Sequence, residues 1–185
     1  MYNVASFYYN DENIEKDLEK AIYWYEKASE KKYAKAAYNL SMIYLKENNY
    51  VDPKKEFYWT EKAAEWGYEP AIHNLAAAYG AGEGVKKDIS KSVELYTKSA
   101  NKGYVNSMFV LGQIYEEGFG AKKDLVLALA WKEIGMKYAN SKSDFQVIEY
   151  EQKRIMEIKS MLNKKQILQA KNKLQELDKQ FKFTN

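Results

Sequence analysis

Small and apolar residues recur every three to four positions in segments of about a dozen residues, with polar stretches between the segments. Residues 36–44 show the order small, leucine, small, tyrosine at spacings of four, one and three. On a helix this spacing keeps one face apolar. The same order returns at 71–79 and 107–115, at offsets of 35 and 36 residues, and a partial copy occupies 1–8. We therefore expect each copy to begin with a helix, called helix A.

Each copy continues with a second polar-to-apolar segment that opens with an aspartate. The four aspartates are Asp17, Asp52, Asp88 and Asp124. Aspartate is a favoured N-cap residue, and Pro53 directly after Asp52 suits the first helical position. Gly67 and Gly103 follow two of these segments, where a left-handed residue ends a helix. Each copy is therefore predicted to hold a second helix, helix B, which makes the copy a helical hairpin.

The period stops after Ala139, and two longer segments with one apolar side follow. The first is predicted to run as a helix from Asp144 to about Met161, and the second to begin at Asn163. A terminal helix that packs on the last repeat with one apolar face and exposes a polar face to solvent can close a repeat array. We expect four repeats, at about 1–35, 36–70, 71–106 and 107–139, and a two-helix C-terminal cap over 140–185.

Composition and charge narrow the range of partners. The 185 residues carry a formal net charge of +3 and contain no cysteine, which excludes disulfides, cysteine-ligated metals and thiol nucleophiles. Residues 140–185 hold 10 basic and 6 acidic side chains, and Arg154 is the chain's only arginine. Base readers and phosphate clamps favour arginine, so no nucleic-acid partner is expected.

No stretch reaches the roughly 18 uninterrupted apolar residues of a membrane-spanning helix. The first 20 residues are acidic instead of showing the basic-then-apolar order of a leader. The sequence as it stands predicts a cytoplasmic protein, or a periplasmic or secreted one if an N-terminal leader has been removed.

Catalytic chemistry finds little support in the residues. His73 is the only histidine, and it shares a column with Tyr2, Tyr38 and Phe109, so no catalytic residue, metal ligand or cofactor is predicted. Ser29-x-x-Lys32 and Ser99-x-x-Lys102 match the first element of a serine-hydrolase signature, but its other elements are absent, and we interpret both as chance matches.

Two sequence segments carry a family resemblance: Tyr79-Gly-Ala-Gly-Glu-Gly-Val-Lys-Lys-Asp88 and Leu111-Gly-Gln-Ile-Tyr-Glu-Glu-Gly-Phe-Gly120. Together with the repeated Lys-Ala pairs, these residues resemble the Sel-one-like repeat family, a relative of the tetratricopeptide repeats. The resemblance covers about 1–139, and the tail is similar to the closing segment of many bacterial members. It implies an all-α fold, a right-handed α-solenoid of helix-turn-helix repeats.

The resemblance also implies a function: a non-catalytic adaptor or scaffold that binds a protein partner. An immunity protein that neutralises a bacterial toxin is an alternative that the same resemblance supports. A serine hydrolase that binds β-lactams, suggested by some cysteine-rich relatives, is a weaker alternative.

By similarity to tetratricopeptide repeats, positions two before and two after the leucine, and one turn further on, face the concave groove. In this chain they are Tyr2, Ser6, Tyr9, Tyr38, Met42, Leu45, His73, Ala77, Phe109, Gln113 and Glu116. Such a stripe fits protein binding. The same rings equally fit a seam between neighbouring A helices, and periodicity does not separate the two. Val4 and Phe7 open the first helix with nothing before them to pack on, which predicts that residues before this end are missing or that another chain covers it, with self-association through this repeat as one such case.

Overall fold

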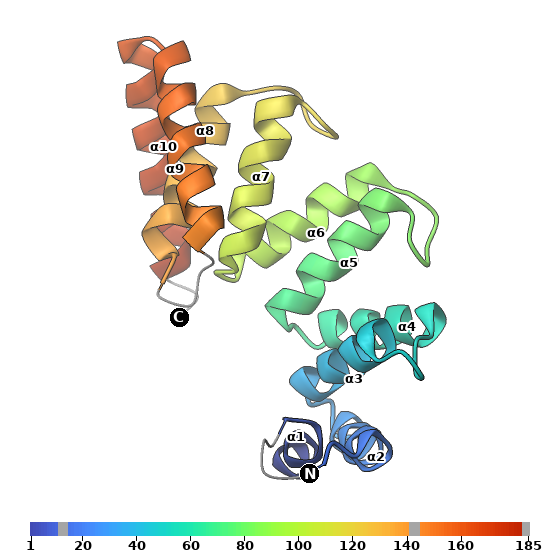
Figure 1. Cartoon of the computed structure of the whole chain (residues 1–185). Coiled ribbons are helices and arrows are strands. Elements are labelled where there is room, and N and C mark those ends of the chain that lie inside the picture. Colours follow the sequence, from blue (N-terminus) through green and yellow to red (C-terminus); the bar gives the residue numbers. More distant parts are fainter. Residues whose placement is uncertain (11–14, 141–144, 183–185) are drawn as a thin grey trace. The chain divides into compact units, whose positions relative to one another are not determined.

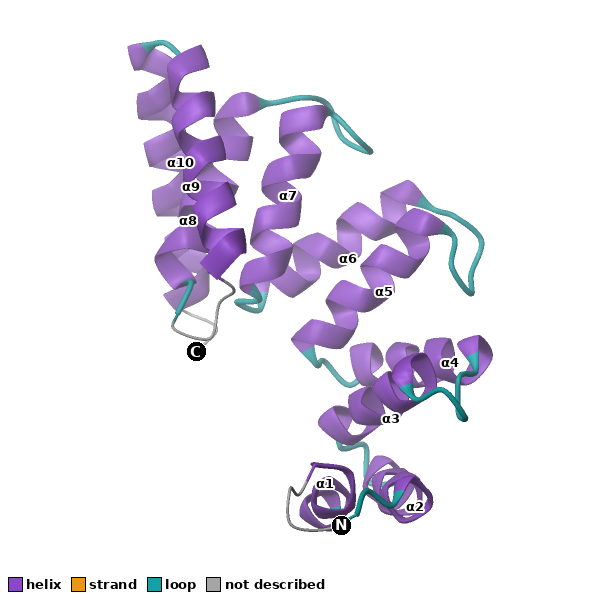
Figure 2. Cartoon of the chain, in the orientation of Figure 1, coloured by secondary structure: helices purple, strands orange, loops and turns teal. Residues whose placement is uncertain are grey.

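The computed structural model describes residues 1–10, 15–140 and 145–182. This part consists of helices joined by loops and turns, with no strand (Figure 2). The chain divides into two compact units, Met1–Lys86 (the N-terminal unit) and Lys87–Asn185 (the C-terminal unit). Figure 1 labels the helices. The N-terminal unit contains α1 (Tyr2–Asn10), α2 (Leu18–Ser29), α3 (Ala34–Lys46), α4 (Pro53–Glu65) and α5 (Glu69–Ala81). The C-terminal unit contains α6 (Ile89–Asn101), α7 (Val105–Glu117), α8 (Leu125–Tyr138), α9 (Phe145–Met161) and α10 (Lys164–Lys182).

All four predicted aspartate N-caps are confirmed. The carboxylates of Asp17, Asp52, Asp88 and Asp124 accept hydrogen bonds from backbone amides two or three residues on, at 2.9 to 3.1 Å. Each bond satisfies an amide that the first turn of a helix leaves without a partner. The aspartates thus fix where helix B begins in every repeat.

Helix B ends in the same way in three repeats, but with different residues. Gly67 and Gly103 take the left-handed conformation that ends α4 and α6, with φ of 89° and 92°. Lys32 holds the matching place after α2 and is the one non-glycine residue with positive φ in the described chain, at 57°. A side chain with a Cβ is disfavoured there, so the first repeat carries a local strain that the next two avoid.

Replacing Lys32 by glycine should therefore stabilise the protein by about 1 kcal/mol. Lys32 is exposed, so its side chain contributes no packing that the substitution would remove. Glycine adopts the positive φ of this turn without strain. Urea unfolding monitored by circular dichroism would measure the gain. Lys31→Gly is the matched control, because residue 31 lies outside the left-handed region and glycine there should give no gain. Equal effects of the two substitutions would contradict the explanation.

The core of the N-terminal unit gathers around one tyrosine. Tyr25 of α2 is fully buried among Ala21, Ala28, Leu40 and Ile43, which come from α2 and α3. Small residues on α2 let α3 approach closely, and the tyrosine ring fills the space between the two hairpins. The stacking of one hairpin on the next therefore depends on side chains of helix B.

The C-terminal unit is closed by two helices that both pack on α8. Ile155 and Ile158 of α9 are buried against α8, and Leu177 and Phe181 of α10 join the core formed by α7 and α8. Asn163 caps α10 as predicted: its side chain accepts from the Gln166 amide, and the Gln166 side chain accepts from the Asn163 amide, both at 3.0 Å. The predicted helix start at Asp144 lies outside the described residues, and α9 begins at Phe145.

Candidate functional site

Eight of the eleven predicted partner-binding residues lie on the three A helices of the N-terminal unit, α1, α3 and α5. Leu45 and Ala77 are exposed. The six others are half-buried: Tyr2, Ser6, Tyr9, Tyr38, Met42 and His73. The structure therefore leaves only part of the predicted stripe open to a partner.

Two of the tyrosines tie neighbouring A helices together. The Asn39 amide of α3 donates to the Tyr2 hydroxyl of α1 at 3.4 Å and to the Tyr25 hydroxyl of α2 at 2.9 Å. The Tyr38 side chain of α3 makes the corresponding hydrogen bond to Asn74 of α5, and burial raises the pKa of Tyr38. These tyrosine–asparagine pairs thus link one repeat to the next. At Tyr2 and Tyr38 this is the arrangement expected of a seam between repeats.

The C-terminal ends of α1 and α3 are joined by a charged cluster that the sequence did not reveal. The Tyr9 hydroxyl donates to Glu47 at 3.1 Å, and the Lys16 ammonium lies 2.5 Å from the same carboxylate and 4.3 Å from the Tyr9 ring centre. Burial, followed by the bond to Glu47, raises the pKa of Tyr9 to about 12. Lys16 lowers the pKa of Glu47. Tyr9 is therefore held in a fixed position at the edge of the A-helix surface.

His73 on α5 is a histidine that burial keeps neutral. Burial lowers its pKa from 6.5 to about 4, because the charged imidazolium would lose its hydration there. At neutral pH the ring therefore behaves like the aromatic residues in its column. This supports a packing role over proton transfer.

The low pKa of His73 predicts a loss of stability in acid. Between pH 6.5 and pH 4 the unfolded chain binds a proton that the folded chain does not, so stability falls as the pH falls. The expected loss from pH 7 to pH 5 is about 2 kcal/mol of unfolding free energy. Urea unfolding of the wild type and of a His73→Phe variant at both pH values would test this. Parallel pH profiles of the two proteins would contradict it.

The three remaining predicted residues lie on α7 in the C-terminal unit, and two of them are buried. Phe109 is only 5% exposed and lies against Gly135 of α8, where an added Cβ would come within 2.5 Å of the ring. Gln113 is exposed and donates to Glu117 at 2.8 Å. Glu116 is buried. Phe109 and Glu116 thus serve internal packing, and neither side chain forms part of an open surface.

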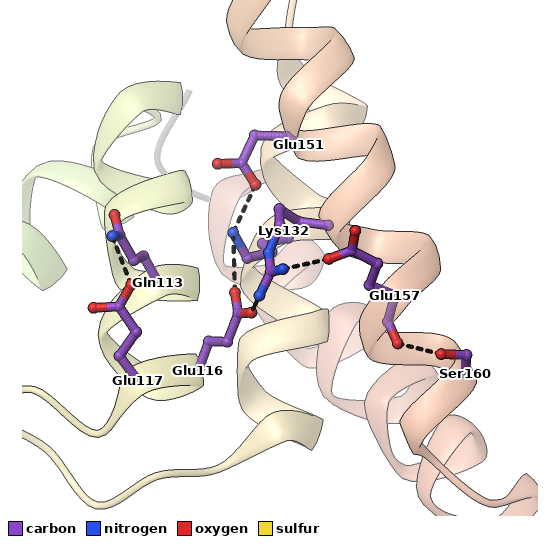
Figure 3. A network of polar contacts seen from close by, with 8 residues as sticks. Gln113, Glu116, Glu117, Lys132, Glu151, Glu157 and Ser160 are labelled. Carbon is purple, nitrogen blue, oxygen red and sulfur yellow. Dashed lines mark hydrogen bonds and ion pairs between the residues drawn. The ribbon is translucent and has the colours of Figure 1, made fainter.

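Glu116 belongs to a network of charges that joins α7, α8 and α9 (Figure 3). The Lys132 ammonium on α8 lies 2.7 Å from Glu151 of α9 and 3.6 Å from Glu116 of α7. Arg154 of α9 contacts both Glu116 and Glu157. Lys132 is 1% exposed, so its charge depends on these carboxylates for compensation. The network anchors α9 to the last repeat, formed by α7 and α8.

A signal for this network is present in the sequence. Lys132 occupies the B-helix column that holds Tyr25, Thr60 and Tyr96, eight residues after each capping aspartate. Tyr25 and Thr60 are both buried, and a lysine in such a column requires a buried acidic partner. The sequence does not say which glutamate provides it, because Glu116 and Glu151 lie 16 and 19 residues away on different helices.

The two Ser-x-x-Lys matches do not form an open nucleophilic site. The Ser29 hydroxyl is buried without a hydrogen-bond partner at the end of α2, and Ser99 is fully buried near the end of α6. A nucleophilic serine must be reachable by its substrate and by a base. Neither hydroxyl is reachable in this structure.

The described residues offer neither a metal site nor a membrane-spanning helix. They contain no group of three or more metal-ligating side chains that could hold an ion. None of the helices in this part of the chain combines the length and the apolar character needed to cross a bilayer.

The repeat pattern matches one known family. The model of the Sel1 repeat matches four consecutive segments, 1–33, 34–68, 70–104 and 105–131. The chain belongs to the Sel1 repeat family. The resemblance read from the glycine-rich loops is thereby confirmed, and members of this family are typically protein–protein interaction modules.

Solved structures of Sel1 repeat proteins resemble this chain over most of its length. A protective antigen of uropathogenic Escherichia coli with an SLR fold is 31% identical, with a TM-score of 0.81, over 97% of this chain and 37% of that one. A Sel1 repeat protein from Oxalobacter formigenes is 27% identical, with a TM-score of 0.68, over 75% of this chain and 58% of that one. Helicobacter pylori cysteine rich protein B is 26% identical, with a TM-score of 0.54, over 69% and 92%.

These likenesses confirm the predicted all-α, solenoid-type repeat fold. The chain spans only 37% and 58% of the length of the first two relatives. No curated protein matches the chain.

Proposed function

We propose that this Sel1 repeat protein binds a protein partner through the A-helix surface of its N-terminal unit. This surface is defined by Ser6, Tyr9, Met42, Leu45 and Ala77. The observation that carries the proposal is Leu45, a large apolar side chain left 49% exposed on α3 one turn after Met42. Leucine, methionine and tyrosine side chains on adjacent helices are the kind of surface that protein partners bury.

The surface is held in place before any partner arrives. The hydrogen bonds that join Asn39 with Tyr2 and Asn74 with Tyr38, and the cluster at Glu47, fix α1, α3 and α5 against one another. A preformed surface loses little conformational entropy on binding. This supports a binding role for the surface.

The proposed surface is narrower than the stripe expected from the sequence. Tyr2 and Tyr38 are engaged between repeats, and His73 is half-buried. Phe109 and Glu116 are buried in the C-terminal unit. The proposal therefore rests on the five residues that define the A-helix surface.

A comparison of two matched variants tests the surface. Leu45→Lys should weaken capture of the partner at least 10-fold, because a desolvated apolar contact at the centre of an interface is typically worth more than 1.4 kcal/mol. Tyr58→Lys is the control, since Tyr58 is also 49% exposed but lies on the B helix α4. Both variants should unfold at the wild-type urea concentration. Affinity capture followed by titration of the purified partner provides the measurement, and equal loss in both variants would reject the A-helix surface.

The identity of the captured partner also separates an adaptor from an immunity protein. If the partner is a toxin whose activity disappears at one-to-one stoichiometry, the immunity function applies. If the partner keeps its own activity in the complex, an adaptor function applies.

A further inference from the structure

A cavity of about 550 Å³ lies in the C-terminal unit, lined by the loop that joins α7 to α8 and by the turn that joins α9 to α10. Both connections lie at the same end of this unit (Figure 1). The volume falls within the range of small-molecule sites, about 300–1,000 Å³. This cavity, called the cap cavity, shares no residue with the A-helix surface.

The floor of the cap cavity is apolar and continuous with the core. Leu162, directly after α9, is 9% exposed and belongs to the buried cluster that holds α9 and α10 against α8. Leu125 and Val126 of α8 pack against the same cluster. Met161 adds a side chain that is 62% exposed. Because the floor is already packed, an apolar ligand group can bury surface there with little ordering of the protein.

The rim of the cap cavity carries two lysines that the described residues leave without a partner. Lys122 and Lys123 line the cavity and are exposed, and within the described chain they make no ion pair, hydrogen bond or ring contact. Asp124 also lines the cavity, but one of its oxygens accepts from the Val126 and Leu127 amides at 3.0 and 2.9 Å. The N-terminus of α8 is therefore already capped, and the two ammonium groups remain available to an anion.

The preceding repeat shows a different arrangement for the same lysine. Lys86-Lys87-Asp88 precedes α6 as Lys122-Lys123-Asp124 precedes α8, 36 positions later. The Lys87 ammonium lies 5.9 Å from the centre of the Phe119 ring, in the loop of the next hairpin. Lys123 has no such ring in the described part of the chain and lines the cap cavity instead. The cavity thus arises where the cap helices, and not another hairpin, follow the loop.

We propose that the cap cavity binds a small amphipathic carboxylate of the fatty-acid type. The ammonium groups of Lys122 and Lys123 hold the carboxylate. The alkyl chain lies over Leu125, Val126 and Leu162.

The lining favours a ligand that has both parts. An inorganic anion such as phosphate gains nothing from the apolar floor, and a neutral hydrocarbon gains nothing from the lysines. Charge-assisted hydrogen bonds between ammonium and carboxylate are about twice as strong as neutral ones. Burial of each methylene group adds to the binding free energy. A carboxylate on an alkyl chain uses the rim and the floor together.

Isothermal titration calorimetry of the full chain with octanoate, acetate and 1-octanol tests the proposal. Octanoate should bind saturably and at least 10-fold more tightly than the other two, because acetate lacks the alkyl chain and 1-octanol lacks the charge. Lys122→Gln combined with Lys123→Gln should weaken octanoate binding at least 10-fold. Lys86→Gln combined with Lys87→Gln is the matched control, since these lysines are also exposed but precede α6, and it should leave the affinity unchanged.

A second pair of variants tests the apolar floor. Met161→Gln should weaken octanoate binding about 4-fold, the value of roughly one buried methylene group. Met156→Gln is the control, because Met156 is 65% exposed on the same helix but does not line this cavity. Amide chemical shifts that change on titration should gather in residues 115–126 and 161–166.

Four results would overturn the proposal. They are no saturable octanoate binding, equal affinity for octanoate and 1-octanol, equal loss in the two lysine pairs, and chemical shift changes that lie outside the two expected segments. None of these results depends on the A-helix surface of the proposed function, whose residues all belong to the N-terminal unit. The failure of either proposal is therefore distinguishable from the failure of the other.

Discussion

Lys132→Met is expected to lower the unfolding free energy of the C-terminal unit by about 3–5 kcal/mol, because it leaves a buried carboxylate without its partner. Glu151 is 6% exposed, and the Lys132 ammonium at 2.7 Å is its ion-pair partner. Methionine keeps most of the apolar stem, which fills the space over Gly112, where a Cβ would meet Lys132 Cγ at 2.5 Å. The substitution therefore removes the charge and preserves the packing.

Urea unfolding of Lys132→Met, with hydrogen exchange of α9, would measure this loss. Lys137→Met is the matched control, because Lys137 forms a 2.6 Å pair with Asp178 while its side chain is 47% exposed. A pair so open to solvent contributes about 1 kcal/mol or less. A double variant, Lys132→Met with Glu151→Leu, should recover part of the lost stability, since no stranded carboxylate remains. If Lys132→Met costs no more than Lys137→Met, the network does not anchor α9.

Tyr25→Ala should cost the N-terminal unit about 3–5 kcal/mol, the range for a large buried aromatic side chain replaced by alanine. Tyr25 is fully buried at the centre of the cluster that joins the first hairpin to α3, so its removal opens a cavity between two repeats. The ring also contacts Tyr2, with ring centres 5.8 Å apart. The loss should therefore spread to the seam between α1 and α3.

Tyr25→Phe separates the ring from its hydroxyl. The hydroxyl accepts from Asn39 at 2.9 Å and lies 3.2 Å from the Ser6 hydroxyl, and losing these bonds should cost about 1 kcal/mol. Thermal unfolding and hydrogen exchange of α1 to α3 would measure both variants. A similar loss for alanine and phenylalanine would show that hydrogen bonding, and not packing of the ring, holds the two hairpins together.

The candidate site was predictable only in part. Periodicity placed all eleven residues on A helices, and the A helices form where it indicated. Exposure was not predictable, because it depends on what the neighbouring helix contributes. Phe109 and Leu45 look equally suitable as apolar contacts in the sequence, yet Phe109 is 5% exposed and Leu45 is 49% exposed. Gly135 contributes to the burial of Phe109, because its missing Cβ lets the ring pack against α8.

The sequence by itself determined the repeat, the helical hairpins and where each second helix begins, because these depend on local signals: capping aspartates, turn glycines and an apolar period of three to four residues. Only the tertiary structure decided which side chains meet across helices. Glu116 reads as a surface residue in its own segment, and it becomes part of a buried network because Lys132 and Arg154 reach it from two other helices. Partners so far apart in the chain are chosen by packing, which no local pattern encodes.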